Sequence, residues 1–287
     1  MAVLLALASA ALFGAMTVAL RFALARGARA EVGALMTALP ALAIALAATG
    51  VYGVRHGAPD VLAAWPFAAA GVLAPGISQI LFTLAVRDAG PSRTSVLVGT
   101  APLFSVAIAL ALLGEPAQAG LIAGAVLIVL GGILLVGERV RPESFKVAGL
   151  LFALGATLLF ATRDSLLRWL SLDTEVPPSL AAAATLASGT LTVAVYVAAT
   201  QVRRETVFAG ARRFGIAGLC FGLSYLCLFE AYYRGRVTVV SPLVATESLW
   251  AVALSVLLLR RAELVGPRLL GGAALVVAGG VLIGLTR

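Results

Sequence analysis

Four ionisable side chains lie in apolar segments of the second half of the chain. Arg163 and Asp164 follow an apolar run that begins at Val147, Glu230 lies near the end of another run, and Glu247 lies near the middle of a third. A charged side chain inside a membrane is costly unless it is paired or wetted. If these segments span a membrane, the four residues indicate a site for a charged solute or a proton.

The depth of each charge can be estimated from the helical rise. At about 1.5 Å per residue, Glu230 lies roughly 6 Å, Arg163 roughly 10 Å and Glu247 roughly 14 Å from one membrane face. This gradation predicts a polar vestibule in which Arg163 is the counter-charge of Glu247 or Glu230. Two alternatives stay open: Glu230 could only pair with Arg234 one turn away, and Arg163 with Asp164 could extend toward the interface.

Aromatic and polar side chains near these charges complete the candidate binding site. Tyr225 shares the segment of Glu230, and Trp250 lies one turn beyond Glu247. Aromatic rings beside carboxylates suit an amine or another cation, through cation–π contact and ion pairing. Further hydrogen bonds could come from Ser78, Gln79 and Thr246. Such polar residues also hold membrane helices together, and aromatic residues also gather at membrane interfaces.

The composition places these segments in a lipid bilayer. The 287 residues are 61% hydrophobic and 12% charged, with a mean hydropathy of +1.06. An apolar run of about 20 residues spans a bilayer as a helix. We therefore expect an all-α integral membrane protein with ten transmembrane helices. The ten runs are 2–20, 32–54, 63–86, 94–114, 119–137, 147–170, 179–200, 214–233, 239–259 and 268–285.

The two halves of the chain resemble each other. Residues 11–22 (ALFGAMTVALRF) align without gaps on 158–169 (LLFATRDSLLRW), and 76–100 align on 222–246. The ranges 1–137 and 147–287 are therefore predicted to be two copies of a five-helix unit. Because five is odd, the second copy must cross the membrane in the opposite sense, as in transporters that bind substrate near the midplane between inverted repeats.

The four charges occur in the second copy only. Their equivalents in the first copy are Met16, Thr17, Leu84 and Ala101. The first copy forms without these charges, which favours a functional role for them over a structural one.

Other residues have a structural interpretation. Pro75, Pro102 and Pro242 interrupt three of the predicted helices and make them candidates for gating. In the fifth and tenth runs, glycines recur seven residues apart, which predicts close packing of these helices. These glycines are Gly124, Gly131, Gly272 and Gly279.

The chain resembles the drug/metabolite transporter superfamily, EamA type, over nearly its whole length. The resemblance rests on the two five-helix copies, on "APLF" with Pro102 and on "LLGEP" with Glu115. In the second copy, "TESLW" supplies Glu247, with Ser248 where the family often has proline, and "RRAEL" supplies Glu263. The resemblance implies a transporter of small metabolites.

Several other classes of function are disfavoured. The net charge of +8 comes from residues that flank apolar runs, which does not suggest nucleic-acid binding. Cys220 and Cys227 lie in one apolar run, and His56 is the only histidine, so we expect neither a metal nor a cofactor. No nucleotide-binding G-x-x-x-x-G-K-[ST] motif occurs, which disfavours an ATP-driven pump.

The sequence therefore predicts a secondary transporter in the cell (inner) membrane, acting as an exporter of an amino acid or another amine-bearing metabolite. Glu247 could bind a proton as coupling ion, because burial disfavours the charged form of a carboxyl group; a facilitator is equally allowed. An intramembrane enzyme, with no catalytic motif recognised, and a structural or regulatory membrane protein are the alternatives. The oligomeric state stays open, a homodimer included.

The orientation is predicted from the positive charges. With ten helices, both termini lie on one side. The loops after the odd-numbered helices hold 15 of the 21 Lys and Arg residues. Positive residues favour the cytoplasmic side, which places both termini outside, whereas the resemblance implies both inside.

Overall fold

The computed structural model describes residues 1–104, 119–136, 145–200, 204–235, 237–259 and 266–285. Within these ranges, the regular structure is helical and no strand occurs. The α-helices are α1 (Ala2–Ala25), α2 (Ala30–His56), α3 (Trp65–Gly71), α4 (Ser78–Ala89), α5 (Pro91–Val98), α7 (Ala119–Val136), α8 (Ala148–Leu170), α9 (Pro178–Ala199), α10 (Arg204–Arg234), α11 (Val237–Val244), α12 (Glu247–Leu254) and α13 (Pro267–Leu285). Short helices of other types are η1 (Leu62–Ala64), η2 (Val72–Ile77) and η3 (Ser255–Leu259).

Six described helical segments are long and apolar enough to cross a membrane. They are Ala2–Ala25, Ala30–His56, Leu62–Ala89, Ala148–Leu170, Pro178–Ala199 and Ala211–Arg234. Shorter apolar helices cover Ile122–Leu135, Glu247–Leu259 and Pro267–Ile283. The predicted fourth span, 94–114, lies outside the described residues beyond Phe104, as do Glu115 and Glu263. The chain is thus an all-helical, multi-pass membrane protein.

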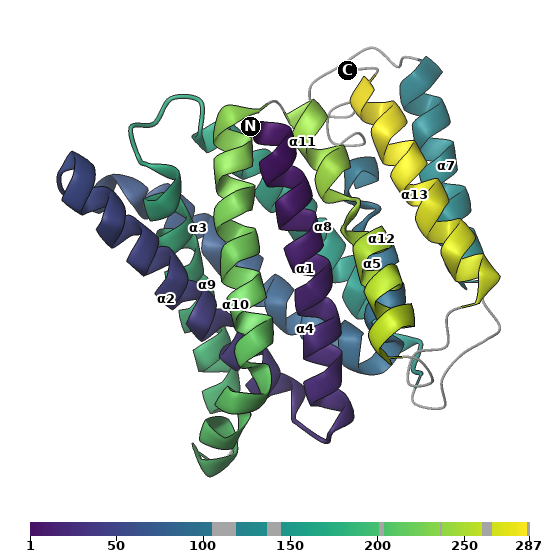
Figure 1. The fold of residues 1–287 in the computed structure, drawn as a ribbon, viewed down its shortest axis with the longest axis horizontal. Coiled ribbons are helices and arrows are strands. Elements are labelled where there is room, and N and C mark those ends of the chain that lie inside the picture. The colour runs from purple at the N-terminus through teal and green to yellow at the C-terminus, as the bar shows by residue number, and fades with distance from the viewer. Residues whose placement is uncertain (105–118, 137–144, 201–203, 236, 260–265, 286–287) are drawn as a thin grey trace.

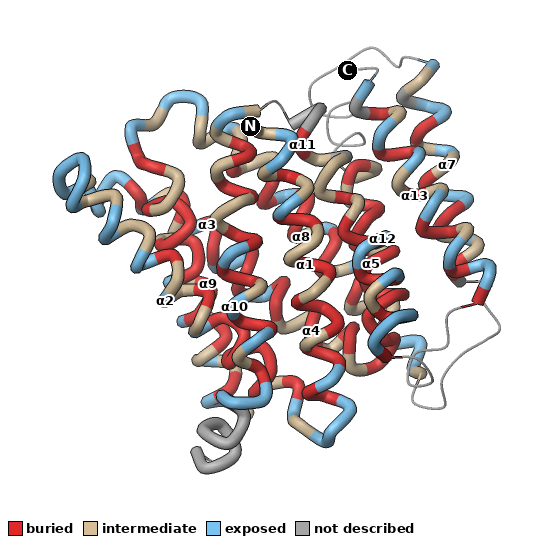
Figure 2. The backbone as a smooth tube through the Cα atoms, viewed as in Figure 1, coloured by how far each residue is buried: buried red, intermediate tan, exposed pale blue. Residues whose placement is uncertain are grey.

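The helices of the two halves interleave. α1 packs against α10 and α12 of the second half, while its sequence equivalent α8 packs against α4 and α5 of the first. α2 packs against α9, and α7 runs beside α13 at one edge of the molecule (Figure 1). Buried residues concentrate in the central helices, and exposed residues mark the outer faces of α2, α7 and α13 (Figure 2). Since many exposed side chains are large and apolar, lipid is the solvent that suits these faces.

Two helices break at equivalent positions in the two halves. α5 ends at Val98 and the chain turns at Thr100, and α11 ends at Val244 and the chain turns at Thr246. Each threonine Oγ1 donates a hydrogen bond of 2.6 Å to the backbone oxygen three residues before it. The same carbonyl also accepts the backbone N–H of that threonine. The hydroxyl therefore adds a second hydrogen bond that closes the turn, which matters where water is absent.

A second matched device is an arginine at each end of the central bundle. Arg21 Nη1 donates to the carbonyl oxygens of Arg87 at 2.9 Å and Val86 at 3.5 Å, in the last turn of α4. Its equivalent Arg168 donates to the oxygen of Tyr232 at 3.0 Å, in the last turn of α10. A cation at a helix C-terminus satisfies free carbonyls and interacts favourably with the helix dipole. Each arginine therefore ties two helices of its own half together, α1 to α4 and α8 to α10.

The predicted interruption at Pro75 and the predicted glycine contacts are both confirmed. Ala74 has a non-helical backbone between α3 and α4, with φ −144° and ψ 116°. A Cβ added at Gly131 would lie 2.7 Å from the Gly272 oxygen, and one added at Gly124 would lie 2.7 Å from the Gly279 oxygen. The backbones of α7 and α13 therefore approach each other more closely than any larger residue allows.

This contact predicts a contrast between neighbouring glycines. Gly131→Ala should lower the melting temperature, because its methyl group collides with the α13 backbone, at an overpacking cost of about 1 to 3 kcal/mol. Gly132→Ala is the matched control, since an added Cβ there meets nothing within 4 Å. Thermal unfolding of the purified protein in detergent measures both variants. Equal melting temperatures would show that α7 and α13 are not in close contact in the protein.

Candidate functional site

A small cavity lies where α1, α8 and α10 meet the broken helices. Its volume is about 30 Å³, enough for one or a few water molecules. Polar and charged side chains share its walls with apolar ones. The lining residues are Ser9, Phe13, Val98, Ala101, Pro102, Phe160, Arg163, Asp164, Ser224, Tyr225, Leu228, Ser241, Val244, Ala245 and Glu247.

Arg163 and Asp164 form a buried ion pair on one side of this cavity. The Arg163 Nε and Nη2 atoms donate to Asp164 Oδ1 at 2.9 and 2.7 Å, and both residues are less than a tenth exposed. The prediction that Arg163 is the counter-charge of Glu247 or Glu230 is therefore wrong. Adjacent residues of a helix point in different directions, but the long Arg163 side chain folds back to reach its neighbour.

Aromatic rings enclose the Arg163 guanidinium. Its central carbon lies 5.0 Å from the centre of the Phe160 ring and 5.3 Å from that of Tyr225, within cation–π range. The Arg163 Nη1 atom also donates to the Tyr225 hydroxyl at 3.3 Å, and that hydroxyl donates to the Ala74 oxygen at 3.4 Å. The interruption before α4 thus supplies a backbone acceptor that orients Tyr225 toward Arg163.

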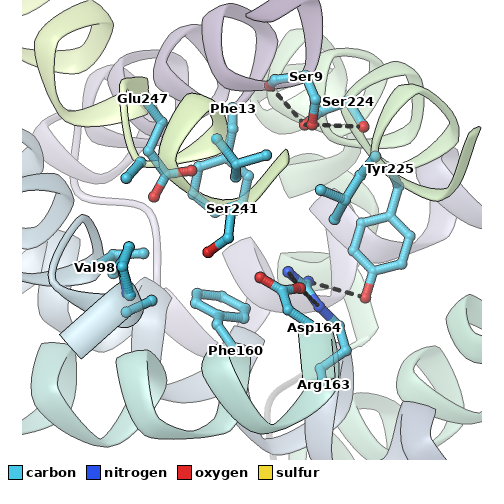
Figure 3. A pocket seen from close by; sticks show the side chains of 15 residues that line it. Ser9, Phe13, Val98, Phe160, Arg163, Asp164, Ser224, Tyr225, Ser241 and Glu247 are labelled. Carbon is cyan, nitrogen blue, oxygen red and sulfur yellow. Dashed lines mark hydrogen bonds and ion pairs between the residues drawn. The ribbon is translucent and has the colours of Figure 1, made fainter. Parts of the chain in front are cut away.

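Glu247 approaches the cavity from the other side. Its side chain extends from α12 toward the space between Phe13 and Ser241, across from the Arg163–Asp164 pair (Figure 3). The residue is 4% exposed, and within the described part of the chain its carboxyl group takes part in no hydrogen bond or ion pair. A buried carboxyl group without a partner is costly, so a partner from outside the chain would stabilise it.

The backbone around Glu247 explains its position. Glu247 is the first residue of α12, directly after the break at Thr246, where the helix dipole favours a negative charge. Close packing against α1 fixes the position of this helix end relative to the cavity. A Cβ added at Gly14 would lie 2.8 Å from the Trp250 Cβ, 2.9 Å from the Ala251 nitrogen and 3.2 Å from the Glu247 oxygen. A residue larger than glycine at position 14 would push α12 away from the cavity.

The cavity lies between equivalent residues of the two halves. Phe13 and Phe160 occupy equivalent sequence positions, and their rings meet edge to face with centroids 6.0 Å apart. Three such pairs line the cavity, namely Phe13 with Phe160, Val98 with Val244 and Ala101 with Glu247. At these three positions the two copies contribute equivalent parts of the wall, but only the second copy contributes charge.

Three serines line the cavity; Ser224 and Ser241 were considered from the sequence as possible hydrogen-bonding residues, and Ser9 was not. Ser9 and Ser224 exchange hydrogen bonds across α1 and α10, each hydroxyl lying 2.9 Å from the other residue's backbone oxygen. Ser241 projects into the same space from α11 (Figure 3). Ser224 and Ser241 are matched by serines in the first half, which was the available signal. Ser9 has no charge or repeat to mark it.

Glu230 and Trp250, which were predicted to bind substrate, do not line the cavity. The carboxylate of Glu230 accepts a 2.7 Å hydrogen bond from Arg234 Nε in a partly exposed i,i+4 pair, which is the alternative that the sequence left open. Trp250 is 45% exposed, and its Cβ lies beside Gly14 of α1. A helix places residues three apart on similar faces only approximately, so the proximity of Trp250 to Glu247 did not bring both to one site.

The predicted polar residues Ser78, Gln79 and Thr246 also lie away from the lining. Thr246 binds its own helix end, as described above. Ser78 and Gln79 are fully buried in α4, and neither the Ser78 hydroxyl nor the Gln79 amide group has a hydrogen-bond partner among the described residues. Tyr225, Arg163, Asp164 and Glu247 are the predicted residues that the fold brings together.

Apolar helices around a small cavity that contains charged side chains define a multi-pass membrane protein with a buried polar site, and the comparisons give its class. The EamA-like transporter family profile matches the chain twice, over residues 1–137 and 147–285. No curated protein matches. One solved crystal structure superposes with a TM-score of 0.64 over 98% of this chain and 95% of that chain at 19% identity, which shows a shared fold. This chain belongs to the EamA-like transporter family, whose members are transporters of the drug/metabolite type.

The buried ion pair predicts a double-variant effect. Asp164→Asn should destabilise the protein by about 3 to 5 kcal/mol, because it leaves the Arg163 charge buried without a counter-charge. The combined variant Arg163→Gln/Asp164→Asn should recover part of this loss. Glu230→Gln is the control for an exposed pair, which is worth about 1 kcal/mol or less.

Melting temperatures of these three variants and the wild-type protein in detergent would test this order. An Asp164→Asn protein as stable as wild type would mean that water or another group already satisfies Arg163.

Proposed function

We propose that this protein exports a small amine-bearing metabolite, such as an amino acid, across the cell membrane. It would work by alternating access, with ten transmembrane helices arranged as two inverted repeats, 1–137 and 147–287. The substrate would bind in the cavity between the repeats. The proposal rests on one observation, the buried Glu247 carboxyl group that faces the cavity without a partner in the described chain.

The charge balance of the cavity favours a cation. Arg163 and Asp164 neutralise each other, so an ionised Glu247 leaves a net charge of −1. Because Glu230 lies elsewhere, this is a smaller negative charge than the four predicted residues together would give. One ammonium group would match it.

The other lining residues suit the proposed ligand. Phe13 and Phe160 offer aromatic ring surface beside an alkylammonium group, and the Ser241 hydroxyl faces the same space (Figure 3). The carboxylate of an amino acid would face Arg163, whose Nη1 makes one hydrogen bond among the described residues, at 3.3 Å to Tyr225. The Arg163–Asp164 pair would thus position one end of the substrate and Glu247 the other.

Substrate binding requires the cavity to expand. A volume of about 30 Å³ is far below the roughly 300 to 1,000 Å³ of typical small-molecule sites. The breaks at Thr100 and Thr246 lie beside the cavity and are the natural hinges, since broken helices line the binding sites of many transporters. The described conformation would then be a contracted state of the cycle.

Transport should depend on Glu247. Proteoliposomes that contain wild-type protein and are preloaded with unlabelled amines or amino acids should take up the labelled compound by counterflow. Glu247→Gln should reduce this uptake at least tenfold, because it removes the charge that binds the ammonium group. Glu230→Gln, which removes a carboxylate outside the cavity, should retain uptake.

Three outcomes would count against the proposal in different ways. Equal loss in Glu247→Gln and Glu230→Gln would show that the effect is not specific to the cavity. Uptake that persists in Glu247→Gln would leave a transporter with a different site. Uptake of anionic or neutral metabolites in place of amines would overturn the substrate class.

Glu247 could also carry the coupling proton. If a proton and the amine compete for this carboxyl group, a pH gradient with the lumen acidic should drive accumulation of external substrate in wild-type proteoliposomes. The imposed gradient should have no effect in Glu247→Gln. Wild-type uptake that does not change with the imposed pH gradient would identify a facilitator.

A further inference from the structure

A second, larger hollow opens on the side of the helix bundle. It lies between α10 and the α12–η3 segment, with α1 as its floor, and these three elements stand side by side in Figure 1. Its volume of about 680 Å³ falls within the range of typical ligand sites. We call it the lateral groove. Its lining residues are Ala15, Val18, Ala19, Phe22, Ala23, Arg26, Arg212, Arg213, Ile216, Cys220, Leu254 and Leu258.

The walls of the lateral groove are apolar, and small side chains of α1 form its floor. Ala15, Ala19 and Ala23 recur every four residues on one face of α1, and their methyl groups leave room that larger side chains would fill. Ile216 and Leu258 form the rims and are 70% and 56% exposed. In a bilayer, such a surface is covered by acyl chains rather than water.

The length of the groove matches one leaflet. From Ala15 to Arg26 the floor extends about 16 Å at about 1.5 Å per residue, close to half of the roughly 30 Å hydrocarbon core. One spanning segment ends at Ala25 and another begins at Ala211. The floor therefore runs from near the middle of the membrane to the headgroup level.

Positive charge is concentrated at the headgroup end. Arg26, Arg212 and Arg213 line the groove there and are exposed. Among the described residues, none of the three arginines has a hydrogen bond or ion pair to a carboxylate, and no acidic residue lines the groove. They belong to the loops after the predicted first and seventh helices, on the membrane face that carries most of the chain's Lys and Arg. Three unpartnered guanidinium groups at this depth would attract a phosphate.

We propose that the lateral groove binds an anionic phospholipid. One acyl chain would lie along the alanine floor of α1, and the headgroup phosphate would lie among Arg26, Arg212 and Arg213. The charge of the site selects an anionic lipid over a zwitterionic one, and the apolar length selects a lipid over free phosphate. The proposal does not depend on the identity of the transported substrate.

The chain contains an internal comparison for this site. A hollow of about 340 Å³ lies against the opposite end of α10, lined by residues of α1, α2, α9 and α10. There Arg55 and His56 are accompanied by Glu230, so the charge is mixed. We expect this second hollow to show no preference for anionic lipid.

The two cysteines report on the two hollows separately. Cys220 lines the lateral groove and Cys227 lines the mixed-charge hollow. The protein would be reconstituted in nanodiscs of phosphatidylcholine alone or mixed with phosphatidylglycerol of the same chains. A small membrane-permeant maleimide would then label the thiols, and peptide mass spectrometry would follow each site. Phosphatidylglycerol should slow labelling of Cys220 severalfold and leave Cys227 unchanged.

Native mass spectrometry of delipidated protein, titrated with each lipid, would measure binding directly. Arg26→Gln/Arg212→Gln/Arg213→Gln should weaken phosphatidylglycerol binding by about fivefold for each arginine removed. Arg212→Lys/Arg213→Lys keeps the charge and should retain binding, which separates lost charge from misfolding. Arg55→Gln removes a charge near the other hollow and should have no effect.

Equal protection of Cys220 by the two lipids would overturn the proposal, as would phosphatidylglycerol binding that persists in the triple variant. Protection by glycerol phosphate without acyl chains would also overturn it, since the groove would then bind phosphate alone.

Discussion

The arrangement of the site depends on the cost of placing a guanidinium where water is scarce. Arg163 is satisfied by Asp164, by the Tyr225 hydroxyl and by two aromatic ring faces. Tyr225 is in turn held by the Ala74 oxygen, which is available because the helix is interrupted there. Since these partners satisfy Arg163 within its own neighbourhood, Glu247 is left as the acidic group of the cavity with no hydrogen bond or ion pair among the described residues. The chemistry of the site follows from this division between a paired charge and an unpaired one.

Around this core, the two halves of the chain use the same backbone devices. A threonine closes each helix break, an arginine caps the end of α4 and of α10, and a phenylalanine from each half meets at the cavity. All these devices satisfy carbonyls or fill space, which any membrane bundle requires. The charges are superimposed on this duplicated scaffold in one half only. The residues that build the duplicated scaffold are therefore different from those that give the cavity its charge.

The sequence was a good guide to features that obey a simple period or cost. Apolar runs predicted the helical membrane protein, glycine spacing predicted the α7–α13 contact, and Pro75 predicted an interruption. Burial cost alone indicated Arg163, Asp164 and Glu247. The partner of Arg163 could not be predicted in the same way, because a long side chain can bend back to its neighbour.

Position along a helix was a poorer guide to what faces the cavity. Glu230 and Trp250 lie close in sequence to lining residues but project elsewhere, because neighbours on a helix face different directions. Ser9 and Phe160 line the cavity because helices distant in sequence converge there. No local pattern contains that information.

A scaffold of two equivalent halves can adopt two conformations that differ only in which half plays which part. If the sequences were identical, these conformations would have equal free energy, and the empty protein would open to both sides of the membrane equally often. Here Glu247 is the sequence equivalent of Ala101 in the first copy, and Arg163 is the equivalent of Met16. The desolvation of these charges then differs between the two conformations, and a difference of about 1.4 kcal/mol shifts their populations tenfold. If the two repeats alternate as proposed above, the asymmetry of the charges would set the side of the membrane on which the empty protein rests.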